Sequence, residues 1–310
     1  MKKVKYGRLA VAGLAIVCVF LVNSCSYAQT ATLKVLDYNT MHGFDGNNAI
    51  KDKYVNWVEN INPDIVNYQE MIGFSQDDLK RFAARYGHNY TVIMNKEAGY
   101  DVTHPLAITS RYPIEVIERR IDGMWHGYVL TRIKGIYVMV THLAPFTLKD
   151  RQKDISIIIN RLQQLPKGAK VLISGDFNSF SRADKAAYGD KLLQSMQRLE
   201  GRLEPKSGTP IVKNRTIYRN NLNNGALDYS VTDSMVKAGF VDAFRQTNKT
   251  FKNSVPVKSQ LKKNSVLRRV DYIWVNALLS KDIISTDIIH DEVTDVISDH
   301  YPVLAEFNIK

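Results

Sequence analysis

From Ala31 to the last residue, short apolar runs rich in β-branched residues alternate with longer amphipathic stretches. Strand-length runs that alternate with helix-length stretches predict an α/β fold with helices packed outside the sheets. No linker, low-complexity tract or internal repeat interrupts this pattern. With 45% hydrophobic and 24% charged residues, the chain is neither disordered nor a polytopic membrane protein, and it can form a large core.

The pattern predicts individual elements. Strands are expected at residues 33–38, 64–68, 106–109, 128–133, 136–141, 171–174, 270–275 and 303–307. Helices are expected at 53–60, 76–86, 150–165, 184–199 and 233–238. Gly135, between two apolar runs, predicts a hairpin turn, and the turn-rich residues 202–224 predict an insertion that is either a loop or a hairpin.

The N-terminal residues 1–28 have the features of an export signal. Four basic residues precede an apolar run over residues 9–22, which is short for a transmembrane helix. Cleavage after Ala28 and a lipoprotein signal that ends before Cys25, with Cys25 lipidated, both fit the residues that follow; an uncleaved anchor is the third interpretation. We therefore expect an exported protein that is lipid-anchored, periplasmic or secreted.

Cysteine usage and charge narrow the chemistry of the remaining chain. The two cysteines, Cys18 and Cys25, both lie in the N-terminal segment. Residues 29–310 therefore have no intramolecular disulfide, no cysteine nucleophile and no cysteine-ligated zinc. The net charge is +11, and residues 1–28 account for only four of the basic residues, so the rest of the chain is also basic. This balance favours an anionic partner.

Polar residues stand at the ends of several predicted strands, where α/β proteins usually assemble their sites. The carboxylate and amide members of this set supply hard oxygen ligands, which suit Mg²⁺ or Ca²⁺ better than zinc. Histidines beside a bound metal suit acid–base work on a phosphoester. The residues are Asn39, Glu70, His142, Asp176, Asn178, Asp299 and His300.

These residues belong to seven short motifs: Tyr38-Asn39, Gln69-Glu70, Ser110-Arg111-Tyr112-Pro113-Ile114, Thr141-His142-Leu143, Gly175-Asp176-Phe177-Asn178, Arg269-Val270-Asp271-Tyr272-Ile273 and Ser298-Asp299-His300-Tyr301-Pro302-Val303. In this order they resemble the endonuclease/exonuclease/phosphatase superfamily, which includes DNase I, exonuclease III, bacterial sphingomyelinases and inositol polyphosphate 5-phosphatases. The resemblance implies the DNase I-like fold, a four-layer α/β sandwich of two packed mixed β-sheets flanked by helices. It also implies that residues 29–310 form a single domain.

The resemblance implies a role for each residue. Asn39, Glu70 and Asp299 would hold Mg²⁺, with Mn²⁺ or Ca²⁺ as alternatives. His300 would help to activate the attacking water and would be paired with Asp271. His142 would bind the phosphate or protonate the leaving oxygen, and Asp176 and Asn178 would orient the water and the phosphate oxygens. The reaction would be a one-step, in-line attack of water on phosphorus.

The remaining histidines are predicted to be structural or exposed at the surface. The five histidines assigned no function are His42, His88, His104, His126 and His290. Asp101 is a candidate partner for His142.

The substrate has three interpretations, each for a protein expected to be a monomer. Residues 249–269 contain seven basic and no acidic residues, which favours a metal-dependent phosphodiesterase acting on nucleic acid, although a solvated loop explains the same charges. Residues 71–74 lack the basic residue that DNase-like members carry there, and export favours a phosphatase or sphingomyelinase-like phosphodiesterase acting on a lipid head group or inositol phosphate. A non-catalytic surface-binding lipoprotein is the remote alternative.

Overall fold

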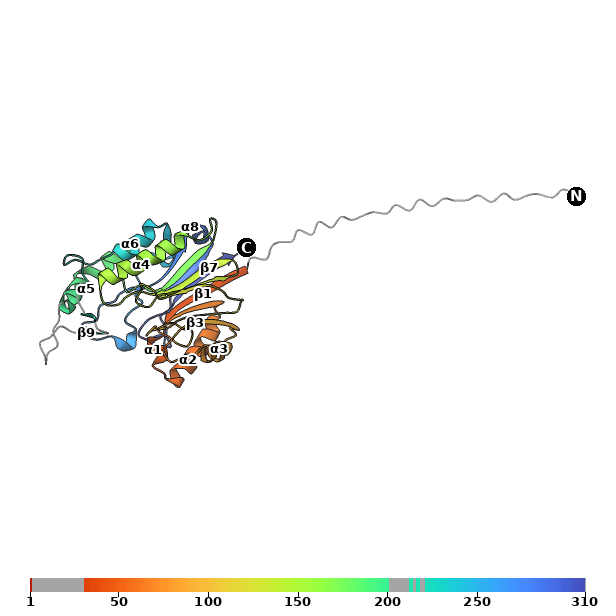
Figure 1. The fold of residues 1–310 in the computed structure, drawn as a ribbon, viewed down its shortest axis with the longest axis horizontal. Coiled ribbons are helices and arrows are strands. Elements are labelled where there is room, and N and C mark those ends of the chain that lie inside the picture. The colour runs from red at the N-terminus through yellow and green to blue at the C-terminus, as the bar shows by residue number, and fades with distance from the viewer. Residues whose placement is uncertain (2–30, 201–211, 214–215, 218–220, 310) are drawn as a thin grey trace.

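The computed structural model describes residues 1, 31–200, 212–213, 216–217 and 221–309 (Figure 1). The predicted export signal lies outside these residues and stays a prediction. Most of the predicted insertion at 202–224 also lies outside them. Its described part contains the antiparallel pair β9 (Val212–Lys213) and β10 (Thr216–Ile217). In the part of the chain that the structure describes, no helix combines the length and the apolar character needed to cross a membrane.

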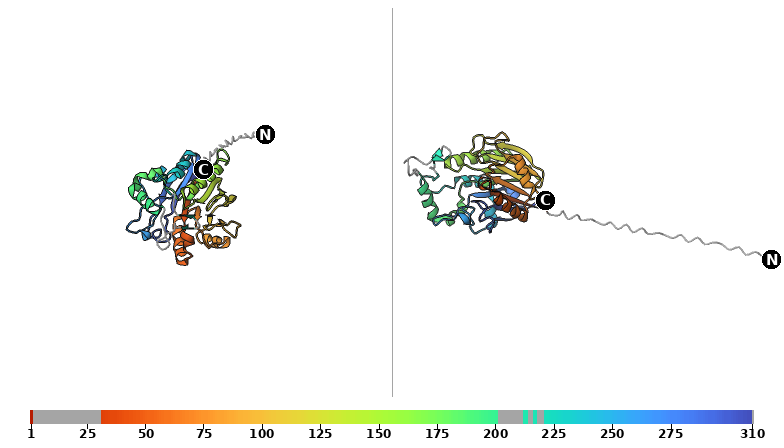
Figure 2. Two further views of the ribbon diagram at one scale, coloured as in Figure 1. Left: turned by 60° about the vertical axis from the view of Figure 1, so that its left-hand side comes forward. Right: turned by 90° about the horizontal axis from the view of Figure 1, so that it is seen from below.

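Two six-stranded mixed sheets form the centre of the fold. The first has the order β13 (Ile283–Ile288), β14 (Val303–Ile309), β1 (Ala31–Asn39), β2 (Ile65–Gln69), β4 (Leu106–Ser110) and β3 (Tyr90–Met94). The second has the order β11 (Phe240–Asp242), β12 (Asp271–Asn276), β8 (Val171–Asp176), β7 (Ile136–His142), β6 (Tyr128–Ile133) and β5 (Glu115–Arg120). Among the described strand pairs, β1–β2 and β7–β8 are parallel and the rest are antiparallel. Ala31 pairs with Ile309, so the ends of the described fold lie side by side (Figure 2).

Helices cover the outer face of each sheet, which completes four layers (Figure 1). The first sheet is covered by α2 (Asn48–Ile61) and α3 (Gln76–Ala84), and the second by α4 (Leu148–Gln163) and α6 (Ser230–Lys237). The remaining helices are α1 (Met41–Phe44), η1 (Arg182–Asp184), α5 (Lys185–Leu199), α7 (Ala243–Thr247), η2 (Lys258–Gln260) and α8 (Ala277–Ser280). The predicted four-layer sandwich of two mixed sheets is confirmed.

The strand sequences explain these layers. Successive side chains of a strand point to opposite faces. In β1, Leu33 and Val35 therefore enter the core between the two sheets, whereas Leu36 and Tyr38 pack against the helices of the first sheet. Since both faces are covered, every residue of the inner strand β2 is buried.

All the predicted strands are present, but four further strands were not predicted. These are β3, β5, β11 and β13, and they are the four edge strands of the two large sheets. Edge strands carry fewer apolar residues because they are less covered; all six residues of β5 are partly or fully exposed. The predicted hairpin turn at Gly135 is confirmed between β6 and β7.

The predicted helices are also present, with shifted ends. Helix α2 begins at Asn48 rather than at residue 53, because the side chain of Asn47 caps it by accepting hydrogen bonds from the Ala49 and Ile50 amides. Helix α6 begins at Ser230 rather than at residue 233. The short helices α1, α7 and α8 were not predicted, since four or five residues carry no helical periodicity.

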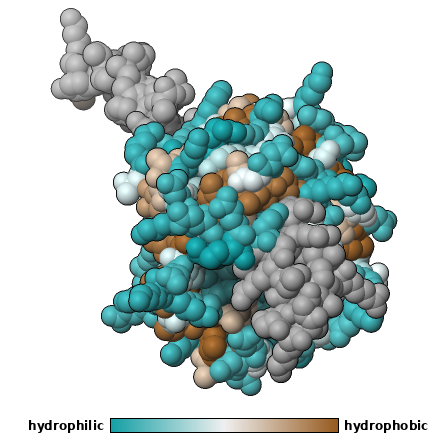
Figure 3. Space-filling model, turned by 90° about the vertical axis from the view of Figure 1, so that its left-hand side faces the viewer, coloured by the Kyte–Doolittle hydropathy of each residue, from teal (hydrophilic) through white to brown (hydrophobic). Residues whose placement is uncertain are grey.

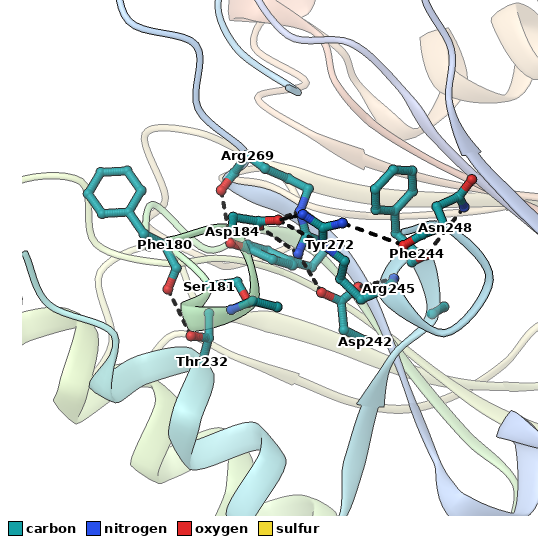
Figure 4. A network of polar contacts seen from close by, with 12 residues as sticks. Phe180, Ser181, Asp184, Thr232, Asp242, Phe244, Arg245, Asn248, Arg269 and Tyr272 are labelled. Atoms are coloured by element: carbon teal, nitrogen blue, oxygen red, sulfur yellow. Dashed lines mark hydrogen bonds and ion pairs between the residues drawn. The ribbon is translucent and has the colours of Figure 1, made fainter. Parts of the chain in front are cut away.

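A buried ion-pair network joins β11, β12 and η1 on the second sheet (Figure 4). The fully buried Arg269 donates from Nε to Asp184 Oδ2 at 2.8 Å and from a terminal nitrogen to Asp242 Oδ2 at 2.6 Å. Arg245 also pairs with Asp184, and the Arg269 guanidinium lies 4.5 Å from the centre of the Tyr272 ring. Since each buried charge has a partner, the network fixes the start of β12 without an isolated charge.

Gly175 allows the parallel strands β7 and β8 to approach closely beside the strand ends. It pairs with Thr141, and a Cβ at Gly175 would lie 1.8 Å from the Thr141 carbonyl oxygen. Its φ of 146° also disfavours other residues. The next residue is Asp176, so the close approach determines where that carboxylate lies.

We expect Gly175→Ala to lower the free energy of unfolding by roughly 2–4 kcal/mol, because the methyl group would push the two strands apart. Gly168→Ala is the matched control: its φ is 84°, but nothing lies within 4 Å of the added Cβ. The control should lose only about 1–2 kcal/mol through the left-handed backbone. Urea unfolding measures both losses, and equal losses would contradict the close-approach argument.

Candidate active site

The predicted site residues gather at one edge of the two sheets. Asn39, His142 and Asp176 end β1, β7 and β8, and Glu70 directly follows β2. Because β1–β2 and β7–β8 are parallel pairs, these strand ends lie at a common edge. The antiparallel β12 begins at this edge, where Asp271 pairs with Asp176.

A cleft of about 230 Å³ opens at this edge. Figure 3 shows the left-hand side of the view in Figure 1, where hydrophilic side chains predominate and apolar patches lie between them. Six of the predicted residues line the cleft: Glu70, His142, Asp176, Asn178, Asp299 and His300. Asn39 and Asp271 are almost fully buried and contact these lining residues. All eight predicted residues therefore lie in or directly beside one cleft.

Asn39 links the two sheets beneath the cleft. Its Nδ2 lies 3.3 Å from Glu70 Oε1 and 3.4 Å from Asp176 Oδ2, and its Oδ1 accepts a hydrogen bond from the Met41 amide. The side chain of Ser298 donates to the Asn39 carbonyl oxygen at 2.7 Å. Asn39 thus orients two carboxylates that come from different sheets.

Glu70 is held as an ionised carboxylate at the cleft. Its Oε2 accepts a hydrogen bond from the His42 amide at 3.0 Å, and its own backbone is left-handed, with a φ of 62°. Burial alone would raise the pKa of Glu70, but the interaction with His142 and the hydrogen bond from His42 outweigh burial and lower the pKa to about 2. Glu70 therefore carries a negative charge over the whole physiological pH range.

His300 is paired with Asp271 on one side and faces Asp176 on the other. Its Nδ1 lies 2.8 Å from Asp271 Oδ2, and its Nε2 lies 3.8 Å from Asp176 Oδ2. Burial alone would lower the pKa of His300, but the carboxylates of Asp271 and Asp299 raise it well above its usual value. Burial and the charge of Asp271 in turn raise the pKa of Asp176 to about 7.

The pKa of His142 is shifted in the opposite direction to that of His300. Its Nε2 lies 3.5 Å from Asp176 Oδ2, and burial lowers the pKa of His142 to about 4, so the ring is neutral at pH 7. Asp101, the candidate partner, is exposed, and no hydrogen bond or ion pair joins it to His142 within the described residues. The expectation for Asp101 is wrong, and Asp176 is the carboxylate that His142 contacts.

Asn178 and Asp299 complete the predicted part of the cleft. The Asn178 amide donates to Asp176 Oδ1 at 2.7 Å, and the Asn178 side chain donates to the Leu143 carbonyl oxygen at 3.0 Å. Its backbone is left-handed, with a φ of 47°, which aims the side chain back toward the strand ends. Asp299 lies at the cleft, next to Ser298.

Three histidines without an assigned function also line the cleft: His42, His104 and His126. The ring centres of His126 and His142 are 4.4 Å apart, and those of His104 and His126 are 4.7 Å apart. His42 is exposed and His126 is buried, as the expectation of structural or surface histidines allows, but all three lie at the cleft, which the sequence did not predict. His88, by contrast, is fully buried between Thr109 and the Pro63 carbonyl, as expected of a structural histidine.

A topological signal could have identified two of them. His104 and His126 stand just before β4 and β6, which run antiparallel to their neighbours β2 and β7. The beginnings of these strands therefore lie at the same edge as the ends of the parallel pairs. His42 follows Asn39 by three residues, in the segment that leaves β1.

The sequence model of the endonuclease/exonuclease/phosphatase family matches residues 38–300. The chain belongs to this family. A stretch of 87 residues is 37% identical to the Escherichia coli K12 protein named "Uncharacterized protein YbhP", and the same match is found in Shigella flexneri. That stretch spans 25% of this chain and 34% of the relative.

Solved structures share the fold at low sequence identity. A 3′ phosphatase, NExo, from Neisseria bound to a product DNA hairpin has a TM-score of 0.63 and 15% identity, and an AP endonuclease from Archaeoglobus fulgidus has a TM-score of 0.59 and 17% identity. Each similarity covers 89% of this chain and 100% of the other. These similarities support the fold rather than a substrate.

We expect Asp271→Asn to lower the pKa of His300, because the substitution removes the closest negative charge that stabilises the imidazolium. The His300 ring would then lose its proton at a lower pH than in the unaltered protein. NMR titration of the ¹⁵N-labelled imidazoles in EDTA measures this shift.

Asp233→Asn is the control for this titration, since it removes a carboxylate that pairs with Arg182 on the outer surface. It should leave the His300 titration unchanged. An unchanged His300 pKa in Asp271→Asn would show that Asp271 does not stabilise the charged ring.

Proposed function

We propose that the protein is a phosphodiesterase that cleaves nucleic acid with the help of a divalent cation. One observation carries this proposal: Asn39, Glu70, Asp176, His142 and the His300–Asp271 pair converge on a single cleft. Membership of a phosphoester-hydrolysing family agrees with this reaction. Solved structures with the same fold include an AP endonuclease and a 3′ phosphatase bound to a DNA hairpin, and for this reason we take nucleic acid as the substrate class to test first.

The donor set suits a divalent cation. Glu70 is ionised, Asp299 faces the same cleft, and hard carboxylate oxygens are the ligands that Mg²⁺, Mn²⁺ or Ca²⁺ accept. When bound, such an ion would supply positive charge to the phosphate oxygens. Asn39 would support it by holding the Glu70 carboxylate in place.

The side chains of the cleft supply the proton transfers. Asp271 fixes the orientation of His300, so that Nε2 faces Asp176 and the attacking water. Asp176, whose pKa is raised to about 7, takes the proton of this water, and the positively charged His300 and Asn178 help to orient the water. His142, which is neutral and lies 3.5 Å from the same Asp176 oxygen, binds the phosphate or the leaving oxygen.

A second hollow adjoins the cleft and would lengthen the surface available to a polymeric anion. The two share Pro145 and Asn178, and the second is also lined by Arg151 and Arg268. On the other side, Gln260 of η2 contacts Met41 at the cleft. The two arginines of the second hollow favour an extended substrate with several phosphates over a single small phosphate.

Glu70→Gln, His142→Ala and His300→Ala should each lower hydrolysis by about 10²-fold or more, because each removes a charge or a proton-transfer group from the cleft. The assay compares plasmid DNA, RNA, sphingomyelin, phosphatidylinositol phosphates and a chromogenic diester, with a divalent cation or with EDTA. His290→Ala, which removes an imidazole outside the cleft, is the matched control and should retain activity.

The pattern of substrates tests the remaining part of the proposal. Cleavage of DNA or RNA that weakens steeply with added salt would support it. Cleavage of the lipid substrates alone, or full activity in EDTA, would contradict it.

A further inference from the structure

A further set of possible metal-binding groups lies in the cleft and shares Glu70 with the residues used above. His42, Glu70 and His104 each offer one ligand atom, and these atoms all lie within 4.8 Å of one another. The three come from separate segments: the one after β1, the one after β2 and the one before β4. Only Glu70 belongs to the set of ligands expected from the sequence.

The distances are close to those of a coordination sphere. His42 Nε2 lies 3.7 Å from Glu70 Oε2, and the rings of His42 and His104 are 5.9 Å apart between centres. Ligand atoms of a tetrahedral zinc-like site lie about 3.4 Å apart, given metal–ligand bonds of about 2.0–2.2 Å. Because His42 is exposed and Glu70 and His104 are partly exposed, small side-chain rotations are enough to close this difference.

Oxygen partners orient both imidazoles. His42 Nδ1 lies 3.4 Å from Asp45 Oδ1, and His104 Nδ1 lies 2.9 Å from Thr103 Oγ1. Metal-bound histidines usually hold their second ring nitrogen against an oxygen in this way, which fixes the tautomer. For His42 this contact leaves Nε2 directed toward Glu70.

The donor types select a class of ion. Mg²⁺ prefers oxygen ligands in a strict octahedron, whereas imidazole suits zinc, cobalt and other transition metals. Two histidines and one glutamate are a ligand set of catalytic zinc sites, which keep one position open. His42, Glu70 and His104 line the same cleft as His142 and Asp176, so an ion that they hold would be accessible to a substrate bound there.

We propose that His42, Glu70 and His104 form a site for a divalent transition metal of the Zn²⁺ or Co²⁺ type, which binds there in preference to Mg²⁺. Only the role of this site in hydrolysis rests on the proposed function; the binding of the metal itself does not. It identifies histidines, rather than oxygen donors alone, as the groups that choose the ion.

Metal binding without substrate tests this site. The full chain is freed of metal with EDTA and titrated with Co²⁺, with visible absorption and calorimetry as readouts. His42→Ala and His104→Ala should each weaken Co²⁺ binding by about tenfold or more. Asp45→Asn should weaken it by less, since Asp45 only orients His42. Circular dichroism confirms that the variants, which change no core residue, remain folded.

His290→Ala is the matched control, because this exposed imidazole lies outside the cleft and should not affect Co²⁺ binding. A large excess of Mg²⁺ should fail to displace Co²⁺. Unchanged Co²⁺ affinity in both His42→Ala and His104→Ala, or displacement by equal amounts of Mg²⁺, would overturn the site.

The two proposals fail separately. Co²⁺ binding that depends on the two histidines, without hydrolysis of any tested substrate, would contradict the proposed function and support the metal site. Hydrolysis supported by Mg²⁺, with Co²⁺ binding that ignores both histidines, would sink the metal site and leave the function.

Discussion

One carboxylate oxygen, Asp176 Oδ2, is the point on which the site depends. It is approached by Asn39 from the first sheet, by His142 from the neighbouring strand and by His300 from the segment before β14. Directly below it, Asp37 and Asn67 of the first sheet both bond to Ser174 of the second, at 2.7 and 2.8 Å. Because these bonds are buried, an error in strand register would leave several polar groups unpaired. The packing of the sheets and the geometry of the cleft are therefore specified together.

The same crowding separates the chemical roles of similar side chains. Of the two imidazoles, His300 has a raised pKa because of its carboxylate neighbours, and His142 has a lowered pKa because it is buried. Of the two carboxylates, Glu70 has a lowered pKa and Asp176 a raised one. Environments that push pairs of titratable groups apart in this way allow one site to provide both an acid and a base.

The sequence predicted the inner strands and the residues at their ends, because buried strands are apolar along their whole length and the motifs follow them directly. It missed all four edge strands, since an edge strand such as β5 alternates with charged residues and resembles a loop. It also missed His42, His104 and His126 as cleft residues. A lone histidine before a strand has no local pattern; only the antiparallel pairing of β4 and β6 brings it to the site.

The basic residues of segment 249–269 also show what a sequence alone cannot predict, namely which charges are paired in the folded protein. The segment has seven basic residues. Arg269 forms buried ion pairs with Asp184 and Asp242, so its charge is not available to a ligand. Lys252 forms an ion pair with Asp287. Lys258 in turn lies 3.5 Å from Asp295. The attraction for a polyanion is therefore weaker than the sequence suggests, and of the other basic residues in this segment Arg268 lines the hollow beside Asn178. Arg268 is therefore a residue of this segment that is placed to contact an anion beside the cleft.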